Sequence, residues 1–382
     1  MAQNSASLTA VAGYLAGYGE TAPPQPPQRT YDYALIVPLF DESPQALPRL
    51  LQHHCHPNLL VIAVVNAPAG AAAEERRRTL ALLQSVTAGC PVDCWVIDRV
   101  NQPLPTKQGV GLARKIGNDA ACRLWTAGQL RCAWLYQTDA DSVLPPDYFS
   151  TPLTDRGAVV FAHQHNSPDP LLQQAATLYE KHMHHYVNGL RQAGSPYAYP
   201  TLGSTMAIHV RDYALVRGFP KRSAAEDFYL LNKVAKISQV THIPSVTVQI
   251  QARLSHRVPF GTGPTLEKIL QSLQKDPAGG LYMTYHPDSF KLLATALTHL
   301  QTLAAGGGLP QDAASSLLIE LGVKQRLPQV RRMSSSTVQR ARMLSQWFDA
   351  GKTLRFIHLA RRYHPDMPLI QLYNGQGTAA VP

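Results

Sequence analysis

The 382-residue sequence contains no apolar run approaching the length of about 18 residues that a helix needs to cross a bilayer. An apolar-leaning patch at residues 8–15 has no basic residue before it, which argues against a secretory signal. The five cysteines include no CxxC pair, so reduced thiols are expected rather than a disulfide framework. Together these absences predict a cytoplasmic protein, and the length is sufficient for a large core.

Acidic residues are in short supply, with 25 Asp and Glu against 35 Lys and Arg. Such a balance favours anionic partners: nucleic acid, lipid headgroups or diphosphate-bearing substrates. Much of the basic excess lies in 324–332 and 352–364, and the second segment has helical spacing suited to peripheral contact with the inner face of a membrane. A solvated helix face is the alternative. Few aromatic residues interleave with these basic ones, so nucleic acid is not an expected partner.

Apolar runs alternate with helical patterns four times over about 110 residues, which predicts a mostly parallel sheet covered by helices on both faces. The carboxyl ends of parallel strands share one edge, where α/β folds bind ligands. We expect a flexible, proline-rich leader, an α/β domain, a helical C-terminal region and a short tail. Their ranges are 1–30, 31–263, 264–373 and 374–382.

Two aspartates follow the fourth predicted strand, Asp139 and Asp141, with only Ala140 between them. Side chains at i and i+2 of an extended segment point to the same side, so both carboxylates can reach one centre. Unpaired, they would repel each other, and a divalent cation removes that penalty. Hard oxygen ligands suit Mg²⁺ or Mn²⁺. The pattern predicts a metal site, with ordinary turn chemistry as the alternative.

The segment 106–121 is basic at its start and contains glycines that let the backbone approach a ligand closely. A helix amino end attracts anions, so Lys107 and Arg114 are candidate ligand contacts. The apolar spacing leaves Arg114 and Lys115 off the predicted buried face. The segment lacks the last glycine of a dinucleotide fingerprint and the GK[ST] of a P-loop. An ordinary amphipathic helix is the alternative.

A second acidic pair, Glu226 and Asp227, precedes a helical pattern. Acids are common in first turns of helices, yet a carboxylate there could also act as general base on an acceptor hydroxyl. Further on, Arg253, His256 and Arg257 follow a predicted strand. His256 could complete a metal shell and the arginines could clamp phosphate, although a lone histidine is more often structural.

Four segments, in this order, resemble motifs of the GT-A fold glycosyltransferases, most of all those of family 2. They are ALIVPLFDE, GVGLARKIGNDAA, TDADSVLPPDYF and RGFPKRSAAEDFYL, within 33–263. The third contains the D-x-D (DXD) motif. The resemblance implies a GT-A-type sheet sandwiched by helices. It also implies transfer of a hexose from a UDP- or GDP-linked nucleotide diphospho-sugar, with Mn²⁺ or Mg²⁺ as cofactor, to an acceptor that the sequence does not identify.

The resemblance also implies residue roles. Asp139 would face the ribose or sugar, Asp141 would coordinate the metal, and Asp227, supported by Glu226, would be the base of an inverting transfer. The usual D-D-G-S after the second strand is missing, so the nucleobase contacts are open and Asp98 is a candidate substitute.

The remaining contacts would stabilise charge that grows on the diphosphate during transfer. Lys107, Arg253 and Arg257 are the candidates, together with the metal. His256 resembles the late histidine ligand of some GT-A enzymes, several of them retaining, whereas the Glu–Asp pair favours inversion. The Q-x-x-R-W signature of processive synthases is absent, so a polysaccharide synthase is not expected.

Two alternatives stay open. A nucleotidyltransferase uses a similar sheet, but usually has a glycine-rich loop after the first strand, where this sequence reads PLFDESPQ. A catalytically degenerate GT-A scaffold could instead bind anionic partners through the basic C-terminal region. The intact D-x-D and Glu–Asp pair argue against decay.

Overall fold

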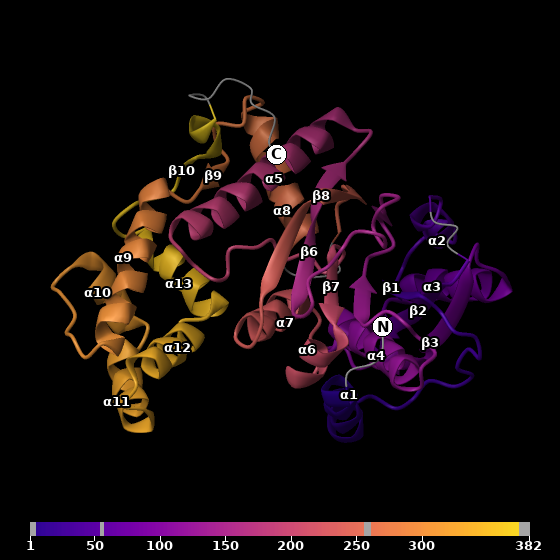
Figure 1. Cartoon of the computed structure of the whole chain (residues 1–382). Helices are drawn as coiled ribbons and strands as arrows, with labels where there is room; N and C mark the ends of the chain where they lie inside the picture. Colours follow the sequence, from indigo (N-terminus) through magenta and orange to yellow (C-terminus); the bar gives the residue numbers. More distant parts are fainter. Residues whose placement is uncertain (1–4, 54–56, 256–260, 374–382) are drawn as a thin grey trace. The chain divides into compact units, whose positions relative to one another are not determined.

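A computed structural model describes residues 5–53, 57–255 and 261–373 (Figure 1). The chain forms two compact units. The first, here called the sheet unit, comprises residues 1–168 and 201–264, and the second, the helical unit, comprises residues 169–200 and 265–382. Each unit has its own apolar core. The sequence pattern predicted a domain boundary near residue 263. In the structure, residues 169–200 belong to the same unit as the C-terminal residues.

The sheet unit is built on a mixed but mostly parallel sheet with the strand order β3-β2-β1-β4-β7-β6-β8-β5. Neighbouring strands β1, β2, β3 and β4 pair in parallel, as do β6 and β8, while β7 and β5 pair antiparallel with their neighbours. The predicted α/β class is therefore confirmed. The strands are β1 (Tyr33–Leu39), β2 (Leu59–Pro68), β3 (Asp93–Leu104), β4 (Trp134–Gln137), β5 (Ser142–Val143), β6 (Ala158–Asn166), β7 (Met206–His209) and β8 (Val240–Gln251).

Helices cover both faces of this sheet, because successive side chains of a buried strand point to opposite sides. Leu35 and Val37 of β1 lie in one core with Leu82 of α3 (Ala73–Ala88). Ile36 faces the other way, toward α4 (Gly109–Thr126), where a Cβ on Gly117 would approach its side chain to 2.6 Å. The remaining helices of the unit are α1 (Ser5–Tyr18), α2 (Ala46–Leu50), α6 (Val210–Leu215) and α7 (Glu226–Ala235).

The N-terminal segment differs from the flexible leader that its composition predicts. Residues 5–18 form helix α1, and Val11 and Tyr14 on one of its faces are buried. The Tyr14 hydroxyl donates to Asp119 of α4 at 2.6 Å. The prolines that follow also contact the fold, since the indole of Trp95 donates to the Pro24 carbonyl. A buried carboxylate that needs donors therefore holds α1 on the sheet unit.

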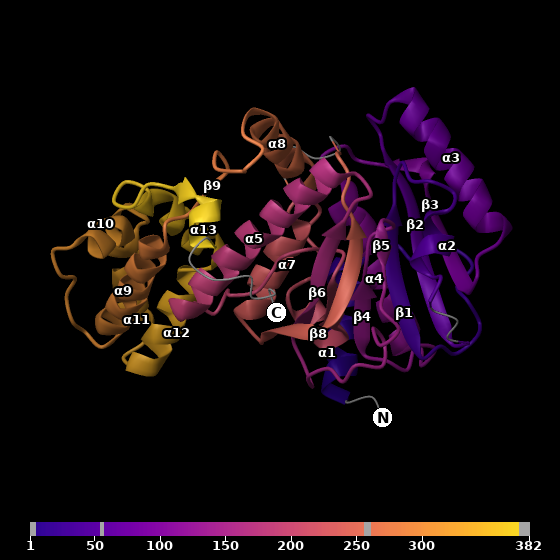
Figure 2. The ribbon, with the colours of Figure 1, turned by 90° about the horizontal axis from the view of Figure 1, so that it is seen from above.

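The helical unit is a bundle, which confirms the predicted helical C-terminal region (Figure 2). Its core contains Phe290, Leu293, Phe348, Phe356 and Ile357. Its elements are α5 (Pro170–Gln192), most of α8 (Thr262–Lys275), β9 (Met283–Thr284), α9 (Pro287–Ala304), α10 (Ala313–Glu320), α11 (Val323–Met333), α12 (Thr337–Trp347), α13 (Ala350–Ala360), β10 (Met367–Pro368) and the 3-10 helix η1 (Leu369–Leu372).

Most of the basic segment 352–364, for which the sequence spacing suggested contact with a membrane surface, lies in helix α13. Phe356 and Ile357 are fully buried in the core of the helical unit, so protein already covers part of the apolar face of this helix. None of the helices in the described residues has the length and apolarity required to cross a membrane.

Candidate functional site

The D-x-D aspartates follow β4 at the edge where the parallel strands β1 and β4 end. The assumption of an extended segment is wrong here, because the backbone N–H of Ser142 donates to the Asp139 carbonyl at 3.2 Å and closes a turn. The two carboxylates accordingly have different arginine partners. Asp139 pairs with Arg114 at 2.6 Å, and Asp141 pairs with Arg253 at 3.0 Å.

Arg114 is the centre of an acidic cluster. Its Nε donates to Glu226 at 3.0 Å and its Nη2 donates to Asp139 at 2.6 Å, while its side chain is only 2% exposed. One guanidinium thus joins the D-x-D to the Glu–Asp pair, although 25 residues separate it from Asp139 and 112 from Glu226. The third nitrogen, Nη1, is buried and has no hydrogen-bond partner in the described chain.

The expectation that Arg114 and Lys115 lie off the buried face of their helix is wrong, since both side chains are buried. Helix α4 is enclosed on several sides, because α1 covers Lys115 and the loop before α7 lies against the start of α4. Gly111 permits the second contact: its N–H donates to the Arg222 carbonyl at 2.9 Å, and any Cβ there would meet backbone atoms.

Burial shapes the acidity of the Glu–Asp pair. Desolvation raises the pKa of Glu226 to about 7, the neighbouring Asp227 charge adds to the rise, and Arg114 opposes it. Burial also raises the pKa of the half-buried Asp227, against the hydrogen bond at 2.7 Å from the Phe228 N–H and the charge of Arg114. A carboxyl group with a raised pKa is a better proton acceptor than an ordinary aspartate. The preceding Ala225 is in the left-handed region with φ 57°.

Asp141 lines a cavity of about 390 Å³, together with residues that follow β1 and residues of β8. Arg253 in this cavity holds Glu42 with two hydrogen bonds, at 2.5 and 2.8 Å, in addition to its contact with Asp141. Sequence reasoning missed Glu42, although its position just after the first predicted strand is the same signal that identified Asp139 and Asp141. We call this the Asp141 cavity.

Other predicted residues lie elsewhere. Asp98 accepts hydrogen bonds from the backbone N–H groups of Val100 and Asn101. Burial by itself would raise the pKa of Asp98, but these hydrogen bonds outweigh burial and the pKa is lowered. Lys107 is exposed in the turn before α4, and within the described chain no hydrogen bond or ion pair joins it to Asp139 or Asp141. His256 and Arg257 lie outside the described residues.

A different candidate metal site occurs in the helical unit. Ligand atoms of His286, Asp288 and His364 lie within 4.8 Å of one another, a geometry that could hold a cation. Lys291 pairs with Asp288 at 2.7 Å and would compete for that carboxylate. The sequence offers little signal for this group, because His364 is distant in the chain from the other two.

No protein-family model matches this sequence, and no curated protein matches it. Among solved structures, the chain is similar to a mannosyltransferase from Pyrobaculum calidifontis in complex with GDP-Man and Mn²⁺, with 15% identity, a TM-score of 0.39 and coverage of 91% of this chain and 94% of that one. It is also similar to an inositol-1-phosphate CTP transferase from T. maritima, with 8% identity, a TM-score of 0.25 and coverage of 63% of this chain and 97% of that one. Neither likeness bears on the chemistry of any residue.

Proposed function

We propose that this protein is a metal-dependent glycosyltransferase that moves a hexose from a UDP- or GDP-linked donor to an acceptor hydroxyl, with inversion and Asp227 as the general base. One observation carries the proposal. The buried guanidinium of Arg114 joins Asp139 of the D-x-D to Glu226 of the acidic pair, at 2.6 and 3.0 Å. Residues proposed for the donor and for the acceptor chemistry therefore share one fixed partner.

The Asp141 cavity supports the donor half of this proposal. Asp141 and Glu42 offer hard carboxylate oxygens to the same cavity, with side chains 17% and 8% exposed, and this donor type suits Mg²⁺ or Mn²⁺. We propose that Asp141 holds the metal, with Asp139 and His256. When bound, the metal would neutralise negative charge on the leaving diphosphate. Arg253 lines the same cavity, and we propose that it contacts that diphosphate.

The acidic pair supports the acceptor half. As the acceptor oxygen attacks the anomeric carbon, the Asp227 carboxylate would take the hydroxyl proton while the nucleoside diphosphate departs. The Phe228 N–H fixes the Asp227 carboxylate from one side. Glu226, held by Arg114, would orient this site rather than exchange a proton with the acceptor. We propose secondary donor-binding roles for Lys107, Asp98 and Arg257, as the resemblance implies.

We further propose that the enzyme works in the cytoplasm on an acceptor that reaches it in solution or at the inner face of a membrane. Four cysteines of the described chain are free thiols, which fits a reducing compartment. Basic residues such as Arg331 and Arg332 on the helical unit suit an anionic acceptor or surface.

A donor panel tests the proposal. The protein is incubated with UDP- and GDP-sugars and Mn²⁺, Mg²⁺ or chelator, and free nucleoside diphosphate is measured. Metal-dependent release that Asp227→Asn slows by about 10²–10⁴-fold would support the proposal. Release of pyrophosphate would indicate nucleotidyl transfer instead. No turnover, combined with salt-dependent binding of anionic polymers, would indicate a catalytically degenerate scaffold.

A further inference from the structure

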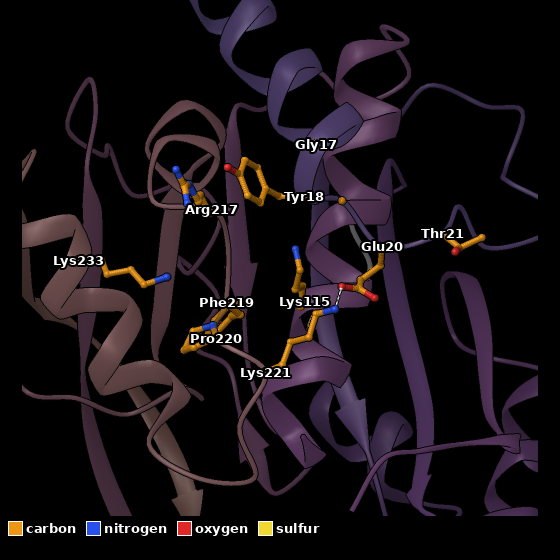
Figure 3. A pocket seen from close by; sticks show the side chains of 11 residues that line it. Gly17, Tyr18, Glu20, Thr21, Lys115, Arg217, Phe219, Pro220, Lys221 and Lys233 are labelled. Atoms are coloured by element: carbon orange, nitrogen blue, oxygen red, sulfur yellow. Dashed lines mark ion pairs between the residues drawn. The ribbon is translucent and has the colours of Figure 1, made fainter. Parts of the chain in front are cut away.

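A second cavity in the sheet unit, of about 510 Å³, lies between the end of α1, helix α4, helix α7 and the loop at 217–221 (Figure 3). It shares no lining residue with the Asp141 cavity. Its charged lining residues are Glu20, Lys115, Arg217, Lys221 and Lys233. We call it the basic cavity.

Positive charge in the basic cavity exceeds the negative charge that faces it. Lys221 pairs with Glu20 at 2.6 Å, and Lys115 pairs with Asp119 at 3.0 Å. Among the residues that the structure describes, no acidic side chain forms an ion pair with Arg217 or with Lys233. Two cationic groups are therefore left without a carboxylate.

These two cations are held in place by neutral contacts. The Lys233 ammonium donates to the Val216 carbonyl at 2.9 Å, and the Arg217 guanidinium lies over the Tyr18 ring at 4.5 Å from its centroid. Burial lowers the pKa of Lys233, and the nearby charges of Lys115 and Arg217 lower it further. Like charges thus converge on one space, an arrangement that an anion would relieve.

The turn that ends α6 fixes the position of Arg217. Arg217 has φ 64° because it is the left-handed residue of this turn, in which its N–H donates to the Ala214 carbonyl at 3.0 Å and the Gly218 N–H donates to the Tyr213 carbonyl at 2.9 Å. The turn thus presents the exposed guanidinium of Arg217 at the cavity (Figure 3).

We propose that the basic cavity binds a phosphate-bearing anion. Lysine ammonium groups supply point charges and arginine supplies a planar fork of donors, the combination that recognises phosphate oxygens. The volume is ample for a phosphate or diphosphate group and part of the molecule that carries it. Bound there, the anion would tie residues 17–21 to the loop 217–221, which runs on toward Glu226. The inference does not depend on the proposed function.

The first test measures binding of inorganic phosphate and pyrophosphate to the full chain by calorimetry and by the shift in melting temperature, at constant ionic strength. Chelator is present throughout, so that metal-dependent diphosphate binding at Asp141 makes no contribution. Arg217→Gln and Lys233→Gln each remove one cavity charge. Arg76→Gln removes an exposed charge on α3 and is the matched control.

We expect the parent and Arg76→Gln to bind pyrophosphate alike and to melt at higher temperature in its presence. Each cavity variant should bind about tenfold more weakly or worse, which corresponds to the loss of one charge-assisted contact. Arg217 is exposed, so its replacement is compatible with folding and serves if Lys233→Gln misfolds. Equal binding by parent and Arg217→Gln, or no binding by the parent, would overturn the inference.

A second arm identifies the source of the phosphate. The same proteins are sedimented with vesicles of phosphatidylcholine alone or mixed with phosphatidylglycerol. Binding to the anionic vesicles that requires Arg217 and is competed by pyrophosphate would assign the site to a lipid headgroup. Pyrophosphate binding without any Arg217-dependent vesicle binding would assign it to a free small molecule. Both results support a phosphate site.

Discussion

Replacing Arg114 with methionine removes the positive charge at the centre of the acidic cluster and keeps an unbranched side chain. Removal of one partner from a buried ion pair costs about 3–5 kcal/mol. The Glu226 side chain is 7% exposed, so its share of that cost is nearly full. The Asp139 side chain is 38% exposed and is screened by solvent. We therefore expect a loss of about 3 kcal/mol in the free energy of unfolding at about pH 8.

The loss in the free energy of unfolding should depend on pH, and Glu226 determines whether the loss grows or shrinks as the pH rises. A carboxyl group whose pKa is raised by folding contributes stability below its unfolded pKa and loses it as the pH rises through the folded pKa. In the parent that window runs from about 4.5 to about 7. Arg114 opposes the rise, so Arg114→Met should raise the folded pKa of Glu226 still further. The gap between parent and variant should thus shrink to about 1 kcal/mol near pH 5 and widen toward pH 8.

Urea unfolding followed by tryptophan fluorescence is the assay. Three of the four tryptophans, Trp95, Trp125 and Trp134, belong to the sheet unit, so the signal reports mainly on the unit that contains Arg114. Arg114→Lys is the matched variant, because one ammonium keeps the charge but cannot reproduce the two-nitrogen contact. A cost for Arg114→Met that is equal at both pH values, or below about 1 kcal/mol at high pH, would refute the reasoning.

Three further changes test the remaining assignments. Asp227→Asn should slow sugar transfer by about 10²–10⁴-fold while metal-dependent nucleotide binding persists, with a smaller effect for Glu226→Gln; transfer at the parent rate would remove Asp227 as base. Asp141→Ala should abolish the Mn²⁺ dependence of UDP or GDP binding measured by calorimetry, and an unchanged dependence would exclude Asp141 as the metal ligand. Tyr14→Phe should lower the free energy of unfolding by about 1–3 kcal/mol, because Asp119 loses a buried donor; an unaltered urea midpoint would contradict the anchoring of α1.

The sheet could be predicted from sequence because its signal is local. A strand buried on both faces reads as a continuous apolar run, and β1 and β2 are such runs. Their alternation with helical patterns indicated parallel pairing, which the register of β1 with β2 and of β2 with β3 confirms. The position of Asp139 and Asp141 after β4 followed from the same reasoning, because the end of an apolar run marks the end of a strand.

What could not be predicted depends on pairs far apart in the chain. Helix α1 has no charged residue and an alanine- and glycine-rich sequence that suggests a flexible segment, and its fixed position depends on the contact of Tyr14 with Asp119. Apolar periodicity placed Arg114 off the buried face, because periodicity takes no account of a buried charge paired with Glu226. Each of these pairs spans more than 90 residues, a separation at which a single sequence shows no pattern.

The distribution of charge connects the two proposed sites. The protein has a formal net charge of +10, yet at the acidic cluster three carboxyl groups lie near one guanidinium, that of Arg114, which pairs with only two of them. The pKa values of Glu226 and Asp227 are raised. At the basic cavity the imbalance is reversed, since Arg217 and Lys233 converge without a carboxylate among the described residues. Folding alone would favour placing opposite charges together, because isolated buried charge is costly. A chain that keeps each sign short of its counter-charge at a separate site is instead suited to the two proposed roles, a proton acceptor at one site and phosphate binding at the other.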